Sequence, residues 1–98
     1  MIDALSLERH SGEASELLSA MANRKRLLIL CNLARGEMQV GALAEKVDLS
    51  QSALSQHLAK LRGMQLVKTR REAQTIYYTL ESSEVRQMLK ALATLYHD

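Results

Sequence analysis

Residues 40–64 read VGALAEKVDLSQSALSQHLAKLRGM, and this stretch decides the fold. Its first part has apolar residues at spacings of three and four, which predicts a short helix with the inner face Val40, Leu43, Ala44 and Val47. Asp48-Leu49-Ser50 predicts a turn, because Ser50 can cap a following helix that runs from Gln51 to about Met64. Two short helices joined by a tight turn predict a helix-turn-helix.

The second of these helices is expected to present a small, polar face to its surroundings. One side of it carries leucines that must point at the core, namely Leu54, Leu58 and Leu61. Glutamine can bond adenine through two atoms, and serine can bond any base. We therefore predict base contacts from Gln51, Ser52, Ser55, Gln56 and His57. A plain solvated face is the alternative for the four polar residues, and His57 is equally well explained as a histidine at the edge of the core.

Two helices are predicted on the amino-terminal side. Ser11 is a candidate cap for a first helix whose apolar residues run from Ala14 to Met21. Asn23 is a candidate cap for a second, largely buried helix that ends at Gly36, a residue favoured just past a helix end.

On the carboxy-terminal side, residues 66–71 and 75–80 are rich in strand-forming residues, which predicts a β-hairpin whose second strand is half-buried. Ser82-Ser83-Glu84 opens a last helix with an apolar seam that reaches Tyr96. We therefore predict one domain over residues 1–98, of the α+β, mainly helical class. Its architecture is a winged helix-turn-helix with terminal helices for dimerisation.

Charge is concentrated in the middle of the chain. Residues 24–71 hold ten Lys and Arg against three acids, although the net charge of the whole chain is only +2. Such a segment suits a polyanion, because each phosphate that is neutralised releases counterions. We predict phosphate contacts from Arg24, Lys60, Arg62, Arg70, Arg71 and Gln74. The alternative is a solvated face. For residues 24–26, including Lys25 and Arg26, a charged helix cap is equally plausible.

The terminal helices carry more apolar surface than one small core can cover. We predict that they pack against a second copy of the chain through Leu17, Leu18, Met21, Val85, Met88, Leu89, Leu92, Leu95 and Tyr96. A twofold homodimer presents two recognition helices, so its double-stranded DNA site should be a palindrome with half-sites about 34–36 Å apart. A module that binds a partner helix is the rival interpretation.

Other classes of protein are disfavoured. The sequence has no glycine-rich phosphate loop and no paired nucleophile and base, so we predict that the chain is not an enzyme. It has no apolar run long enough to span a bilayer, and its first residues are acidic rather than basic, which predicts a cytoplasmic protein without a membrane partner.

Three stretches of the chain are distinctive: MANRKRLLIL at 21–30, LSQSALSQHL at 49–58 and TRREAQTIYY at 69–78. Together they resemble the ArsR/SmtB family of bacterial regulators, and in particular a subgroup with a rhizobial nodulation repressor and a Vibrio haemolysin regulator. The likeness extends from about Ala14 to Tyr96. It implies a winged helix, dimerisation through the first and last helices, and operator binding that controls transcription, most simply by repression.

The family's sensor positions differ in this chain. Metal-responsive members carry Cys-Val-Cys where Gln39-Val40-Gly41 stands here. The last helix offers only Glu84, His97 and Asp98 as ligands, so neither a metal nor another cofactor is expected.

The single cysteine, Cys31, matches the first cysteine of a redox-sensing branch, but His97 stands in place of the second. We expect a buried, inert thiol. The alternative is that Cys31 pairs with His97 to tune a thiolate or to bind a metal.

Overall fold

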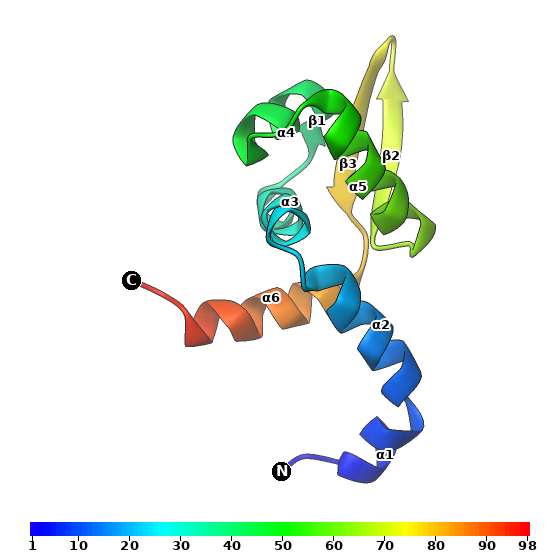
Figure 1. The fold of residues 1–98 in the computed structure, drawn as a ribbon, viewed down its shortest axis with the longest axis vertical. Coiled ribbons are helices and arrows are strands. Elements are labelled where there is room, and N and C mark those ends of the chain that lie inside the picture. The colour runs from blue at the N-terminus through cyan, green and yellow to red at the C-terminus, as the bar shows by residue number, and fades with distance from the viewer.

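The computed structural model describes all of residues 1–98, as six helices and a small three-stranded sheet (Figure 1). The elements are α1 Ala4–Arg9, α2 Ser11–Met21, α3 Arg24–Arg35, β1 Met38–Gln39, α4 Val40–Val47, α5 Gln51–Gly63, β2 Val67–Glu72, β3 Thr75–Leu80 and α6 Ser83–Leu95. The predicted α+β, mainly helical class and the order of its elements are confirmed. Two elements were not predicted: α1, which buries no residue, and β1, which is too short to show any alternation.

Side-chain caps set most of the helix starts. Asn23, Ser50 and Ser82 each accept a hydrogen bond from the backbone N–H three residues on, at 3.0–3.2 Å, as the sequence predicts. The prediction for Ser11 is wrong, because Ser11 is itself the first residue of α2. The cap position is held by His10, whose side chain makes no capping bond. At the far end of α3, Gly36 has φ +152°, which explains a glycine there.

The wing is an antiparallel hairpin flanked by β1, in the strand order β1-β3-β2. The strand β2 runs one residue further than predicted, to Glu72, which leaves a two-residue turn at Ala73 and Gln74. Ala73 has φ +56°, a value such turns require. The predicted alternation along β3 is wrong, since only Leu80 is buried and residues 75–79 are all half-exposed. The hairpin extends beyond the core, so both of its faces meet solvent (Figure 1).

The core lies where α3, α4 and α5 meet the base of the hairpin. Its fifteen buried residues are all apolar: Ala20, Met21, Ile29, Leu30, Leu33, Leu43, Ala44, Val47, Leu54, Leu58, Leu61, Leu66, Val67, Leu80 and Val85. The expectation that α3 is largely buried is wrong, because only three of its twelve residues are buried.

The terminal helices extend away from this core. Helix α6 gives it only Val85, and α1 gives it nothing. Figure 1 shows α6 and the α1–α2 pair projecting in different directions from the side opposite the wing tip. The radius of gyration is therefore 14.5 Å, against about 13 Å for a compact domain of this length.

Candidate nucleic-acid interface

Helix α5 has one apolar and one polar side. Its leucines at 54, 58 and 61 are at most 1% exposed and anchor the helix to the core. Gln51, Ser52, Ser55 and Gln56 are all exposed, and His57 is half-buried. Both glutamine amides are free of hydrogen bonds within the chain, and the only side-chain contact among the four is a 3.4 Å approach of the Ser52 hydroxyl to the Ser50 hydroxyl. The face therefore offers several unused donors and acceptors to a ligand.

The turn before α5 is held from both sides. Asp48 adopts the left-handed conformation at φ +56°, and the Leu49 N–H donates to the Ala44 carbonyl at 3.0 Å. The ammonium group of Lys25 on α3 donates to the carbonyls of Val47 at 2.6 Å and Asp48 at 3.3 Å. A cation at a helix C-terminus pairs with carbonyls that the helix leaves free. Lys25 thus ties the start of α3 to the end of α4 and to the turn that leads into α5.

The three basic residues at the start of α3 have different surroundings. Arg26 closes the end of α2, donating from Nε to the Ala20 carbonyl at 2.7 Å and from Nη2 to the Ser19 carbonyl at 3.2 Å. In the chain without DNA, Lys25 and Arg26 therefore act as helix caps, which is the alternative raised for them from the sequence. The helix ends that they cap are those of α4 and α2. Arg24 is exposed and makes no such bond.

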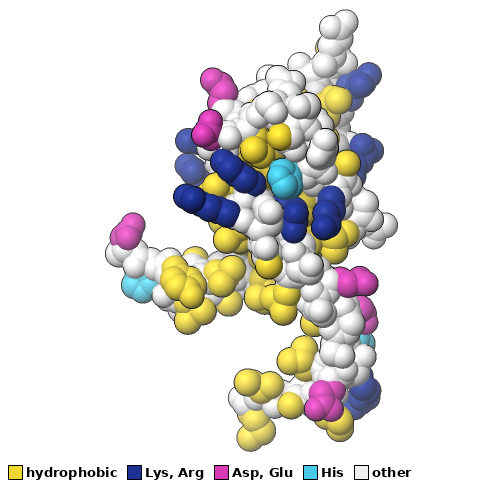
Figure 2. All heavy atoms as spheres, viewed as in Figure 1, with side chains coloured by type: hydrophobic (Ala, Val, Ile, Leu, Met, Phe, Trp, Pro, Cys, Tyr) yellow, Lys and Arg dark blue, Asp and Glu magenta, His cyan; other side chains and the backbone are white.

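Four of the cations predicted to contact phosphate are exposed and form no ion pair within the chain: Lys60 and Arg62 on α5, Arg24 at the start of α3 and Arg71 on β2. In Figure 2, Lys and Arg side chains gather over the part of the molecule built by α3, α4 and α5. Gln74 is exposed at the tip of the wing. These cations are therefore available to an anionic partner.

Arg70 differs from those cations because it is already bound. It donates from Nε and Nη2 to both carboxylate oxygens of Glu37, at 2.8 and 2.7 Å, and from Nη1 to Glu72 at 2.7 Å. Its guanidinium carbon lies 4.4 Å from the centre of the Tyr77 ring. The hydrogen bonds from Arg70 hold the pKa of Glu37 below its ordinary value.

The apolar residues assigned to a dimer interface fall into three groups. Met21 and Val85 lie in the core of the chain itself, so they offer little surface to a partner. Leu17, Met88, Leu89 and Leu92 are partly buried against that core. Leu18, Leu95 and Tyr96 are 52%, 71% and 78% exposed.

The N-terminal segment adds exposed apolar residues that were not predicted, namely Leu5 and Leu7 on α1 and Ile2 before it. Yellow side chains mark both α1 and α6 in Figure 2. A six-residue helix without a buried face has no core periodicity to reveal it. The Asp3 carboxylate, which accepts from the Ser6 N–H at 3.1 Å, was the one local signal for its start.

The sensor positions have other roles in this structure. The Gln39 side chain caps α4, its Oε1 accepting from the Ala42 N–H at 2.8 Å. A Cβ on Gly41 would lie 2.9 Å from that oxygen, so glycine leaves room for the cap. Nowhere in the 98 residues do three or more His, Cys, Asp or Glu side chains gather in a way that could hold a metal ion.

Cys31 is exposed rather than buried, so that prediction is wrong. It lies on the side of α3 turned away from the core residues Leu30 and Leu33. Partial desolvation nevertheless raises the pKa of its thiol, which disfavours the reactive thiolate.

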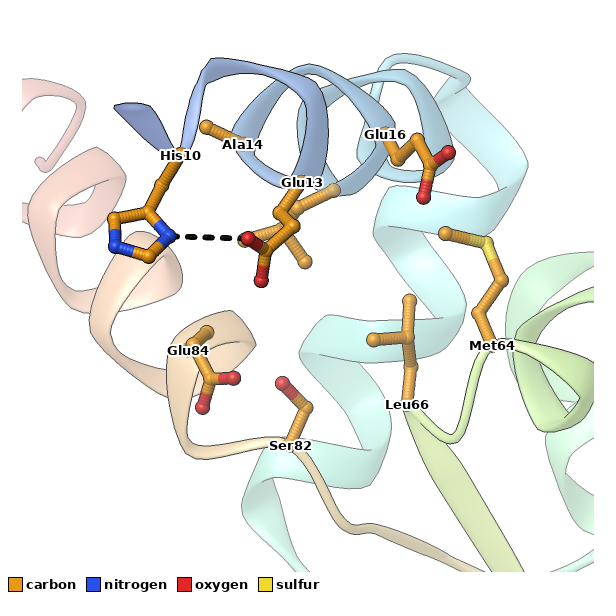
Figure 3. Close-up of a pocket in the computed structure, with 9 residues that line it drawn as sticks. His10, Glu13, Ala14, Glu16, Met64, Leu66, Ser82 and Glu84 are labelled. Carbon is orange, nitrogen blue, oxygen red and sulfur yellow. Dashed lines mark hydrogen bonds and ion pairs between the residues drawn. The ribbon is translucent and has the colours of Figure 1, made fainter. Parts of the chain in front are cut away.

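A cavity of about 360 Å³ opens between α2 and the start of α6. Figure 3 shows His10 and Glu13 on one side of it and Ser82 and Glu84 on the other, with Met64 and Leu66 to the right. His10 Nδ1 lies 3.0 Å from the Glu13 carboxylate. Three carboxylates line this cavity, so its charge is opposite to that of the basic surface around α5.

Known proteins are similar to this chain in sequence and in architecture. The model of the family described as "Bacterial regulatory protein, arsR family" matches residues 23–69, from the cap of α3 into β2. The nodulation protein NolR of Rhizobium meliloti is 64% identical over 85 residues, which cover 87% of this chain and 70% of NolR. The chain belongs to the ArsR family. This confirms the resemblance seen in the sequence.

Two further relatives show how widely the likeness extends. The transcriptional activator HlyU of Vibrio cholerae is 56% identical over 90 residues, covering 92% of this chain and 83% of HlyU. The crystal structure of the transcriptional repressor BigR from Xylella fastidiosa superposes with a TM-score of 0.93 at 32% identity, covering 99% of both chains.

The function class follows from this membership. The chain is a DNA-binding transcriptional regulator with a winged-helix fold, and it is not an enzyme. None of its helices combines the length and the apolar character needed to cross a membrane.

Proposed function

We propose that the chain acts as a homodimer that reads a palindromic operator with α5 in the major groove. The observation that carries this proposal is the polar face of α5, which is exposed, free of internal bonds and bordered by unpaired cations. A helix fits the major groove, and the residues near its N-terminus are best placed to reach base edges. Aliphatic residues at these positions could contact the thymine methyl group but could not hydrogen-bond a base edge.

The residues divide into two roles. Gln51, Ser52, Ser55 and Gln56 contact bases, with His57 at the margin of the same surface. Arg24, Lys60, Arg62, Arg71 and Gln74 contact phosphates and position the protein without reading sequence. Arg70 is left out of this set because Glu37 and Glu72 already occupy it.

The surface area of the chain supports the dimer. Its accessible surface is 7074 Å², whereas a compact monomer of this size exposes about 5,600 Å². The excess of roughly 1,450 Å² exceeds the about 800 Å² that one partner buries in a standard interface. The exposed leucines and Tyr96 of the terminal helices supply apolar surface for this contact. We propose that α1, α2 and α6 form it.

A twofold dimer implies a DNA site with matching symmetry, whose half-sites lie about one helical turn apart. Blocking a promoter needs only DNA binding, so we propose repression, acting in the cytoplasm on the chromosome. HlyU is named an activator and BigR a repressor, so the direction of control differs among relatives. We also propose that control does not use a metal at the start of α4, where Gln39 serves as a cap.

The test compares variants in gel shifts on two DNAs. One is an operator fragment found by footprinting the organism's own promoters, and the other is random DNA. Gln56→Ala should weaken cognate binding by about 1–3 kcal/mol per half-site and spare random DNA, if the lost contact is bidentate. Arg71→Ala should weaken both DNAs alike and reduce the salt slope by about 0.9 for each half-site, or about 1.8 for the dimer. Gln87→Ala is the matched control, an exposed glutamine that lies outside α5 and the wing and is not among the residues assigned to the DNA or dimer contacts.

Two outcomes would contradict the proposal. If Gln56→Ala weakens cognate and random DNA equally, α5 does not read bases. If the wild-type protein binds DNA with no dependence on salt, phosphate contacts do not drive binding, and the protein-interaction module becomes the better interpretation.

A further inference from the structure

The side chain of Arg70 in the wing reaches across the whole sheet and is ion-paired at its far end. Arg70 of β2 is paired in register with Tyr77 of β3, and Tyr77 is paired with Gln39 of β1. The guanidinium lies over the Tyr77 ring and reaches Glu37, the residue immediately before β1. One side chain therefore joins the outer strand of the wing to the strand that leads directly into α4.

The electrostatics around Arg70 make it a poor phosphate ligand. Three of the five N–H groups of its guanidinium are already donated to carboxylates. Two carboxylates surround one cation, so the cluster of Arg70, Glu37 and Glu72 carries a net charge of −1 and repels a phosphate. Arg71, the next residue along the strand, has no such partners.

We infer that Arg70 is a positioning residue that clamps the wing to β1 and α4, and that Arg71 and the wing tip contact DNA in the place this clamp sets. The inference rests on the proposed function above.

The sheet needs such a clamp because its inner pairing is short. Strand β1 has two residues, and only Met38 and Gln39 pair with β3. A bidentate Arg–carboxylate pair has defined geometry as well as energy, so it can fix the direction of a hairpin that leaves the core. Without the clamp, the hairpin would pivot about its base. The wing would then have to be ordered on binding, and this would weaken each of its DNA contacts.

The experiment measures operator binding by Glu37→Gln, because the two roles for Arg70 predict opposite signs. If Arg70 bound phosphate, removing its competing carboxylate would free it and tighten binding. If Arg70 is a clamp, Glu37→Gln should weaken binding by about two- to fivefold, the range of a half-exposed ion pair. Glu45→Gln is the matched control, since Glu45 is exposed on α4 without an ion pair and reports the effect of losing one negative charge.

Arg70→Lys provides the second readout. Lysine keeps the positive charge but cannot form the bidentate pair, so it should bind the operator as weakly as Glu37→Gln does. The double variant with both changes should be no weaker than either single one, because both break the same contact. The circular dichroism spectrum of every variant is expected to match that of the wild type, since Glu37, Glu45 and Arg70 are all on the surface.

The clamp is overturned if Glu37→Gln tightens operator binding at least as much as Glu45→Gln does. It is also overturned if Arg70→Lys binds the operator like the wild type. Either result would leave the proposed function intact, because wild-type binding and its salt dependence are measured in the same series. Loss of salt dependence in the wild type would instead count against the proposed function.

Discussion

Replacing Leu95 with alanine should weaken the proposed dimer strongly while leaving the fold intact. Leu95 is 71% exposed and belongs to no part of the buried core. Complete burial of a leucine contributes about 1.5–3 kcal/mol, so about 1–2 kcal/mol remains to be gained when a partner covers the exposed part. A twofold axis places the substitution in both chains, which doubles the loss to about 2–4 kcal/mol.

A loss of this size is easily measured. It corresponds to an increase of about 30- to 700-fold in the dissociation constant of the dimer. Sedimentation velocity over a concentration series gives that constant, and gel shifts at the same concentrations should show weaker operator binding. Thr94→Ala is the control, because Thr94 is exposed on the same helix and its hydroxyl bonds only to the Lys90 carbonyl of that helix.

Two results would contradict a dimer contact at Leu95. The first is a wild-type protein that sediments as a monomer at every concentration. The second is an equal dissociation constant for Leu95→Ala and Thr94→Ala. The second result would mean that the end of α6 lies outside the interface.

Four further predictions concern single contacts. Ser50→Ala removes the cap of α5 and should cost about 1 kcal/mol, lowering Tm by about 4–8 °C in a thermal melt. Lys25→Met leaves the end of α4 without its cation and should weaken operator binding without changing the salt slope, as gel shifts would show. Cys31 has a raised thiol pKa, so its alkylation by iodoacetamide should be slower at pH 7 than that of an unfolded cysteine and should accelerate only at higher pH. Glu37 has a lowered pKa, so its pair with Arg70 should persist below the ordinary range for a glutamate and break as the pH falls through that lowered value, which NMR titration of the side-chain carboxyl would follow.

Local signals predicted the helix-turn-helix closely. The bounds of α4 agree with the prediction at both ends, and α5 differs only at its last residue. The reason is that helix periodicity and capping act within four residues, so a short window contains all the information. Where a local signal was ambiguous, as at Ser11, the prediction was off by one residue.

Features that depend on distant partners were not predictable in this way. Strand β1 exists only because Met38 and Gln39 meet β3, nearly forty residues later. The exposure of Cys31 was also missed, because apolar spacing alone does not tell which side of α3 the other elements cover. Both outcomes depend on how elements pack, and single-sequence patterns do not specify packing.

Capping residues and apolar spacing set where the helices of the binding unit begin and end, and they give α5 a polar side opposite its leucines. Which cations are free depends instead on the contacts that folding makes. Lys25 meets a carbonyl 22 residues away and Arg70 meets Glu37 33 residues away, whereas Arg71 meets no partner. In the sequence all of these residues look alike, because charge is a property of one residue and an ion pair is a property of two positions that folding brings together.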